Sequence, residues 1–248
     1  RPKTMNKNTY EPALNKAGVT TREAHPTGKG ATKRILLKYA GSAGIEPGVQ
    51  DGGVELTQLS IELRDGTRAL LRPVLPEDRG RLQHGLLRMS AESRYRRFFS
   101  YTPGLSEEQL RYFTEVDQEN HVAWIALDPL TAGHSGIGIA RFIRMKDQPT
   151  MAEIAIAVVD AFQDQGLGTA LLAILYLMAQ KRGITTLRAV VLIENSTMTS
   201  WFRRMGAKGG LQTAGVADMD LIIHPDLSRL PGDPTAKRFA HHVRAFRN

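Results

Sequence analysis

The stretch that most constrains this chain is a short apolar segment that runs through two glycines into a second apolar segment. Residues 154–159 alternate and are rich in β-branched side chains, which is typical of a buried strand. The apolar side chains of residues 170–180 instead fall on one face of a helix. Between the segments lies the pattern QxxGxG, formed by Gln163, Gly166 and Gly168. This order predicts a strand, a tight loop and a helix.

The two glycines give the loop a specific chemistry. Without a Cβ, Gly166 and Gly168 let the backbone approach a ligand closely. The following helix offers N–H groups without intrahelical acceptors and the positive end of its dipole, which suits an anion such as a pyrophosphate. A plain tight turn would give the same pattern. Neither GxxxxGK[ST] nor GxGxxG is present, so the loops of P-loop NTPases and Rossmann enzymes do not fit.

This segment resembles motif A of the GNAT acyl-CoA N-acyltransferases, whose signature is [QR]xxGx[GA] after a strand that carries an acidic residue. Here Glu153 precedes the pattern on the predicted strand. The resemblance implies that acetyl-CoA is the co-substrate and that Gln163 and the backbone of the loop hold its pyrophosphate. The loop residues concerned are Asp164, Gln165, Gly166, Leu167, Gly168 and Thr169. It also implies that the strand near Val158 and Val159 bonds the pantetheine arm.

Composition limits the class of protein. With 248 residues and 42% apolar content, the chain can bury a full core as one domain. No apolar run approaches the roughly 20 residues of a membrane span, and the start lacks a secretory signal, so we expect a soluble, cytoplasmic protein without a membrane partner. The chain has no cysteine, which excludes disulfides, Cys-ligated zinc and an acyl-cysteine intermediate. No HExxH pattern occurs, and no metal is expected.

The net charge of +8 lies entirely at the two ends of the chain. Residues 1–55 hold nine Lys and Arg against five Asp and Glu, and residues 228–248 hold five against one. The residues between them hold nineteen of each and are neutral. A basic groove is therefore not required of the fold, and nucleic acid is an unlikely partner because loose tails give only salt-sensitive attraction to polyanions.

Three segments follow from this division. Residues 1–55 are rich in glycine and poor in core-forming side chains, which predicts a flexible extension. Residues 56–227 form the predicted folded domain, and residues 228–248 a basic C-terminal tail in which His241 and His242 are solvated. In the domain we expect strands at 67–74, 121–127, 136–145, 151–159, 186–193, 208–213 and 217–224, and helices at 76–89, 91–99, 106–116, 170–180 and 196–204.

This order of elements matches the GNAT fold, an α/β (α+β) fold with a mixed, mostly antiparallel twisted sheet flanked by helices. Within residues 65–117 the chain also carries DG, RPxxPED and LRMSAESRYRRFF. These motifs resemble the acyltransferase domain of the bacterial Pat-type protein lysine acetyltransferases. For the Arg-rich helix, a solvated face with Tyr95, Phe98 and Phe99 in the core is the plain structural interpretation, and it is compatible with this resemblance.

Glu153 is the candidate catalytic base. A lysine titrates near 10.4, so loss of its proton at pH 7 costs about 4.6 kcal/mol, and a base has to accept that proton. The resemblance places the family's catalytic glutamate at Glu153. The alternative is a partly exposed glutamate at the end of a strand, paired with Arg141 or Arg144.

A second signature starts at Asn195 and resembles GNAT motif B, NxxMxxxFxxxG. The resemblance implies that the Asn195 side chain helps to hold the pantetheine arm, whereas its position also predicts a helix N-cap. Phe202 stands where many relatives have a tyrosine proposed to protonate the leaving thiolate, so no general acid is assigned.

Together these patterns predict an acetyl-CoA-dependent N-acetyltransferase that modifies exposed lysines of a protein, and the resemblance names acyl-CoA synthetases as acceptors. One alternative is the acetylation of a small amine, which an acidic acceptor cleft would favour. Another is a non-catalytic acyl-CoA-binding regulator that contacts nucleic acid through its basic ends. The sequence does not identify the acceptor, the acyl chain length or the oligomeric state.

Overall fold

The computed structural model describes residues 58–99, 103–213 and 215–247. A single eight-stranded sheet has the order β1-β2-β3-β4-β5-β6-β8-β7. All neighbouring strands are antiparallel except β5 and β6, which run parallel. The strands are β1 (Leu59–Glu62), β2 (Arg68–Pro73), β3 (His121–Asp128), β4 (Ser135–Arg144), β5 (Met151–Val158), β6 (Thr186–Leu192), β7 (Lys208–Thr213) and β8 (Val216–Ile222).

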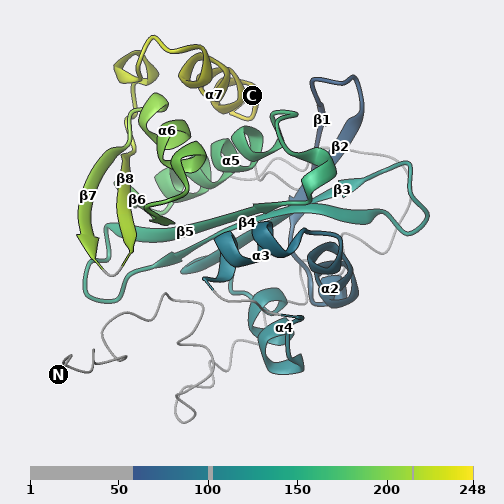
Figure 1. Cartoon of the computed structure of the whole chain (residues 1–248). Coiled ribbons are helices and arrows are strands. Elements are labelled where there is room, and N and C mark those ends of the chain that lie inside the picture. Colours follow the sequence, from purple (N-terminus) through teal and green to yellow (C-terminus); the bar gives the residue numbers. More distant parts are fainter. Residues whose placement is uncertain (1–57, 100–102, 214, 248) are drawn as a thin grey trace, which may run out of the picture.

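Helices cover both faces of this sheet (Figure 1). One face carries α2 (Arg79–Leu87), α3 (Ala91–Phe98) and α4 (Glu107–Thr114), and the other carries α5 (Leu167–Lys181), α6 (Ser196–Arg204) and α7 (Pro234–Ala245). Short 3-10 turns occur at Pro76–Asp78, Asp160–Phe162 and Leu227–Arg229. The mixed, mostly antiparallel sheet between two helical layers is the predicted fold.

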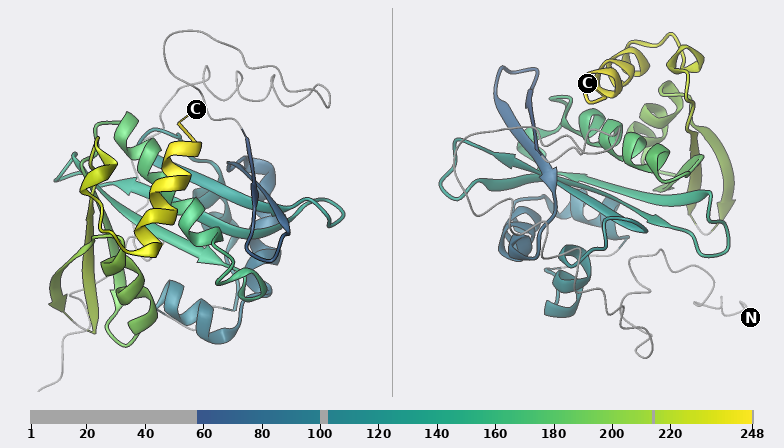
Figure 2. Two further views of the ribbon diagram at one scale, coloured as in Figure 1. Left: turned by 90° about the horizontal axis from the view of Figure 1, so that it is seen from above. Right: turned by 180° about the vertical axis from the view of Figure 1, so that it is seen from behind.

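The core lies mainly between the sheet and α5. Nearly every side chain of α5 from Leu167 to Ala179 is buried, and these side chains meet Trp124 and Phe142 of β3 and β4. A helix that is apolar on all sides has to be enclosed by other elements. Strands β3–β5 cover one side of α5, and α7 lies along another (Figure 2).

The prediction of a solvated C-terminal tail is wrong for residues 234–245. These residues form α7, whose Ala236, Phe239, Ala240 and Val243 are buried in the main core. Phe239 packs edge-on against Tyr176 of α5, with ring centroids 5.2 Å apart. The charges that gave the impression of a tail lie on the opposite face of an amphipathic helix. The C-terminal segment is therefore part of the folded domain.

Two other predictions concern the N-terminal side. Residues 1–57 lie outside the described residues, and with them the predicted extension. Where the structure begins, it adds a strand that was not predicted: β1 pairs with β2 from Leu59↔Leu71 to Glu62↔Arg68. Only Ile61 of its four residues is buried, so the segment shows almost no apolar alternation.

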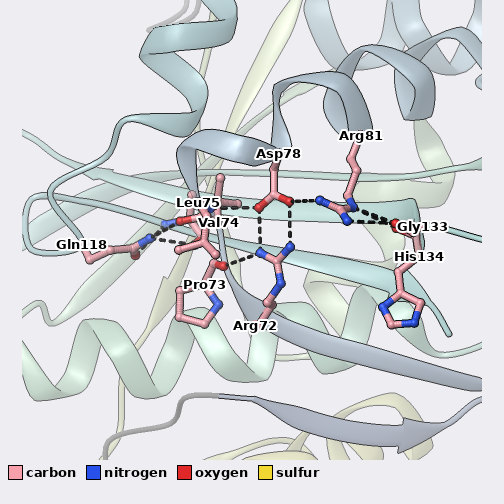
Figure 3. Close-up of polar contacts among 10 residues, drawn as sticks. Arg72, Pro73, Val74, Leu75, Asp78, Arg81, Gln118, Gly133 and His134 are labelled. Carbon is pink, nitrogen blue, oxygen red and sulfur yellow. Dashed lines mark hydrogen bonds and ion pairs between the residues drawn. The ribbon is translucent and has the colours of Figure 1, made fainter. Parts of the chain in front are cut away.

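The RPxxPED motif has a structural role at the start of α2 (Figure 3). The Asp78 carboxylate is fully buried and receives a two-pronged contact from Arg72, with both N–O distances 2.7 Å. It also accepts the Leu75 backbone N–H at 2.9 Å and a guanidinium N–H of Arg81 at 3.1 Å. One carboxylate thereby ties β2 to α2.

We expect Asp78→Ala to lower the free energy of unfolding by about 3–5 kcal/mol, because it leaves the buried Arg72 without its partner. Urea denaturation at neutral pH measures this change. The matched control is Glu77→Ala, since Glu77 is exposed in the same turn and should shift stability by no more than about 0.5 kcal/mol. A loss at Asp78 as small as that at Glu77 would contradict the structural role.

Candidate functional site

A cleft opens where two neighbouring strands separate. The parallel strands β5 and β6 pair with each other from Met151↔Thr186 to Ile154↔Ala189. Beyond that point they continue to Val158 and Leu192 without pairing with each other. Between them lies a cleft of about 420 Å³, a volume within the usual range of ligand pockets. Buried backbone groups need partners, so unpaired strand edges in a cleft suit a ligand that carries amides. The predicted site residues that line the cleft are Glu153, Val158, Gln163, Asp164, Gly166, Gly168, Thr169 and Asn195.

The glycine loop forms one end of this cleft. Gly166 has φ of +90°, a conformation that favours glycine, and it precedes the first turn of α5. A Cβ built on Gly168 meets no atom within 4 Å, so the space above this residue is open. The N–H groups of the first two helical residues have no acceptor within the helix, whereas the Thr169 N–H already donates to the Gly166 carbonyl at 3.1 Å. The loop therefore presents donors and open space at the same place, which is the arrangement that an anion requires.

The Gln163 side chain is exposed at the cleft but is hydrogen-bonded within the protein. Its amide nitrogen donates to the Val158 carbonyl at 3.1 Å and to the Ser93 hydroxyl at 3.3 Å. These bonds join the end of β5 to α3 and fix the course of the loop. The Gln163 side chain thus braces the loop, and the groups that the loop can offer to a ligand are those of its backbone.

Three predicted loop and strand residues do not present side chains to the cleft. Val159 is buried elsewhere, and its N–H donates to the Ile137 carbonyl at 3.0 Å. That N–H is therefore engaged within the sheet and does not bond a pantetheine arm. Leu167 is fully buried in the core, and the Gln165 carbonyl accepts the Arg64 backbone N–H at 3.1 Å. Gln165 and Leu167 therefore belong to the loop by their backbone, and their side chains do not line the cleft.

Asn195 is the N-cap of α6 and also lies in the lining of the cleft. Its side-chain oxygen accepts the Met198 backbone N–H at 3.2 Å, which makes it the N-cap of α6. It also lines the cleft although its exposed fraction is only 6%. Phe202, on the same helix, lines the cleft and carries no proton to donate. Among the described lining residues there is no tyrosine that could replace it.

Glu153 lies at the other end of the cleft, on the sheet face that α3 and α4 cover. It stands opposite Ile143 of β4 and Arg188 of β6. The two arginines of the alternative interpretation are engaged elsewhere. Arg141 contacts His121 and the Phe113 ring, and Arg144 bonds Asn120 and the Arg182 carbonyl.

A group of buried cations lies beside Glu153. Burial lowers the pKa of Arg97 to about 10, and the attraction of Glu153 opposes this shift. Burial and then repulsion from Arg97 lower the pKa of Arg141 to about 9. Both guanidiniums are still charged at neutral pH, whereas burial and Arg141 lower the pKa of His121 to about 3 and keep it neutral. Arg97 is therefore half-buried next to the site, not part of a purely solvated helix face.

A contact that sequence reasoning missed joins α3 to the loop. The Asp160 carboxylate accepts the Ser90 backbone N–H at 2.9 Å and the hydroxyls of Ser90 and Ser93 at 2.8 Å each. Desolvation alone would raise the pKa of Asp160, but these hydrogen bonds outweigh it and hold the pKa below its usual range. The predicted role of Ser90 as the cap of α3 is present as well. The bond between Ser90 and Asp160 could not be predicted from the sequence, because the two residues are 70 positions apart and meet only in the folded chain.

Two classes of site are not seen in the part of the chain that the structure describes. No group of three or more histidine, aspartate or glutamate side chains there is arranged to hold a metal ion. Nor does any helix in the described ranges have the length and apolar character to cross a membrane.

Comparison with known proteins agrees with this geometry. Residues 68–208 match the family model of the acetyltransferase (GNAT) domain. Acetyltransferase Pat of Mycolicibacterium smegmatis is 34% identical over 181 residues, which are 72% of this chain and 53% of that protein. The chain thus spans about half the length of this curated relative.

Solved structures give the same result. The crystal structure of the GNAT domain of S. lividans PAT is 32% identical with a TM-score of 0.62, and the match covers 66% of this chain and 96% of that chain. The structure of yncA from Salmonella typhimurium with its cofactor acetyl-CoA is 16% identical with a TM-score of 0.50, covering 64% and 95%, and shows the fold alone. The predicted resemblance to Pat-type domains is confirmed, and the chain belongs to the GNAT acetyltransferase family.

Proposed function

We propose that this chain transfers the acetyl group of acetyl-CoA to the ε-amine of lysine residues on a protein. The observation that carries this proposal is the cleft between β5 and β6, which has the glycine loop and the start of α5 at one end and Glu153 at the other. An extended cofactor fits this cleft when its anionic end lies at the glycine loop and its reactive end lies at Glu153. Membership of the acetyltransferase (GNAT) family supports the choice of co-substrate.

Each part of the cleft has a task in this proposal. The backbone N–H groups from Gly166 to Gly168 hold the pyrophosphate, and Val158 with Asn195 orients the pantetheine arm. Glu153 accepts a proton from the lysine ammonium, directly or through water. The neutral amine then attacks the thioester carbonyl, the C–S bond breaks, and the nitrogen loses its second proton to water as the amide forms. Water returns a proton to the released thiolate, because Phe202 has none to give, and Glu153 releases the first proton to solvent.

The charge of the cleft favours a protein acceptor over a polyamine. Five arginines and only two carboxylates, Glu153 and Asp164, line it, so a small polycation would be repelled. The arginines are Arg64, Arg96, Arg97, Arg204 and Arg238. The relationship to Pat-type domains makes acyl-CoA synthetases the acceptors to test first.

The test is a thiol-release assay with acetyl-CoA, run against a lysate proteome, a purified acyl-CoA synthetase and a panel of small amines. Anti-acetyl-lysine blots and mass spectrometry identify the product. We expect release of CoA coupled to acetyl-lysine on protein. Release with small amines alone would establish the first alternative, and CoA binding without release would establish the non-catalytic one.

A further inference from the structure

The helix α7 reaches the cleft with two residues of its N-terminal half, the buried Thr235 and the exposed Arg238. Its buried side chains, from Ala236 to Val243, pack against α5, and α7 also contacts α6. Thr235 and Arg238, one turn apart, line the cleft together with Gly166, Gly168 and Asn195. The family model ends at residue 208, so α7 is an addition to the matched part of the chain. It therefore contributes a wall of the cleft that the GNAT motifs do not supply.

Arg204, in the last turn of α6, lies next to this wall. A Cβ on Gly206 would come within 3.0 Å of Pro231, so the end of α6 and the segment before α7 are in close contact. Arg204 and Arg238 both act electrostatically on the carboxylate of Asp233, the N-cap of α7. The Thr235 backbone N–H bond to Asp233 is the larger cause of its lowered pKa.

These two arginines are exposed and carry charge in excess. In the described residues neither has a carboxylate within 4.0 Å, and Asp233 is the one acid that senses both of them. Two guanidiniums against one carboxylate leave a net positive charge at this end of the cleft. The other two exposed arginines of the lining are already used. Arg64 donates to the Asp164 carbonyl at 2.9 Å and braces the loop, and Arg96 pairs with Glu92.

We propose that Arg238 of α7, with Arg204 of α6, binds the 3′-phosphate of coenzyme A. This inference rests on the proposed function. With the pyrophosphate at the glycine loop and the thioester at Glu153, the remaining anion of coenzyme A is the phosphate monoester on its ribose. Such a group carries about −1.5 to −2 charges at pH 7 and three strong acceptor oxygens. Guanidinium forks match it in geometry as well as in charge.

The experiment compares coenzyme A with 3′-dephospho-coenzyme A, which differ by this one phosphate. Isothermal titration calorimetry is run on the full chain, on Arg238→Gln and Arg204→Gln, and on the control Arg244→Gln. Arg244 is an exposed arginine of the same helix that does not line the cleft. We expect the wild-type protein to bind coenzyme A about tenfold or more tightly than the dephospho form. Each variant should lose most of that preference with unchanged affinity for the dephospho form, and the control should keep it.

The outcomes separate this inference from the proposed function. If the wild-type protein binds both ligands equally, or if the preference survives in Arg238→Gln and Arg204→Gln, the phosphate lies elsewhere and the inference fails while the proposed function stands. An equal loss for both ligands would also overturn it, because the arginines would then act on the cleft as a whole. If the wild-type protein binds neither ligand, the proposed function fails and the inference fails with it.

Discussion

Glu153→Gln is expected to lower kcat by about 10²–10⁴-fold, the usual contribution of a general base. The substitution keeps the shape of the side chain and one acceptor oxygen but cannot take a proton. Affinity for acetyl-CoA should stay within a few fold, because the pyrophosphate site lies at the opposite end of the cleft. Steady-state kinetics with a protein acceptor, together with calorimetry for the co-substrate, measure the two quantities separately.

The pH profile adds an independent readout. Raising the pH should partly rescue Glu153→Gln, since more of the acceptor lysine is then already neutral. Glu62→Gln on the exposed edge of β1 is the matched control and should behave as wild type. Near-normal kcat at pH 7 would make Glu153 structural. Asp160 would be a weak replacement, because three hydrogen bonds stabilise its charged form.

Gly168→Asp should abolish measurable binding of coenzyme A while the protein stays folded. A Cβ at this position meets nothing within 4 Å, and an acidic side chain in the first turn of α5 is favourable for the helix. The same carboxylate would lie where the pyrophosphate binds, and like charges in contact cost several kcal/mol, or about 10²-fold or more in affinity. Calorimetry measures the loss.

Two further variants separate charge from size at this position. Gly168→Asn has nearly the same shape as the aspartate without its charge, and Gly168→Ala adds only the Cβ. We expect affinity to fall in the order Ala, Asn, Asp, with unfolding midpoints that differ little among them. Unchanged affinity in a folded Gly168→Asp variant would place the pyrophosphate away from this loop.

The parts of the fold that could be predicted from the sequence are those that depend on local patterns. The strand, glycine loop and helix around Gly166 depend on near-neighbour periodicity and on the one residue type that accepts φ of +90°. The caps at Ser90, Ser106 and Asn195 likewise depend on contacts three residues apart. Such interactions are present in the sequence before any tertiary contact forms.

The features that the sequence did not reveal depend on distant contacts or on weak signals. The burial of Arg97 beside Glu153 and the bond from Asp160 to Ser90 exist only after the sheet has formed. The strand β1 is too short to show a period. The helix α7 did have a signal, since Ala236, Phe239, Ala240 and Val243 follow the helical period after the capping pair Asp233-Pro234. The five basic residues against one acidic residue in 228–248 instead suggested a solvated tail.

The central claim is that one cleft joins an acetyl donor at the glycine loop to a lysine beside Glu153. A single-turnover reaction with isotopically labelled acetyl-CoA and an acyl-CoA synthetase as acceptor tests it most directly, with intact and tandem mass spectrometry of both proteins. We predict one labelled acetyl group on a lysine ε-amine of the acceptor for each CoA released, at a rate that Glu153→Gln lowers by about 10²-fold or more. Release of CoA without acetyl-lysine on the acceptor, or an equal rate in Glu153→Gln, would contradict the claim.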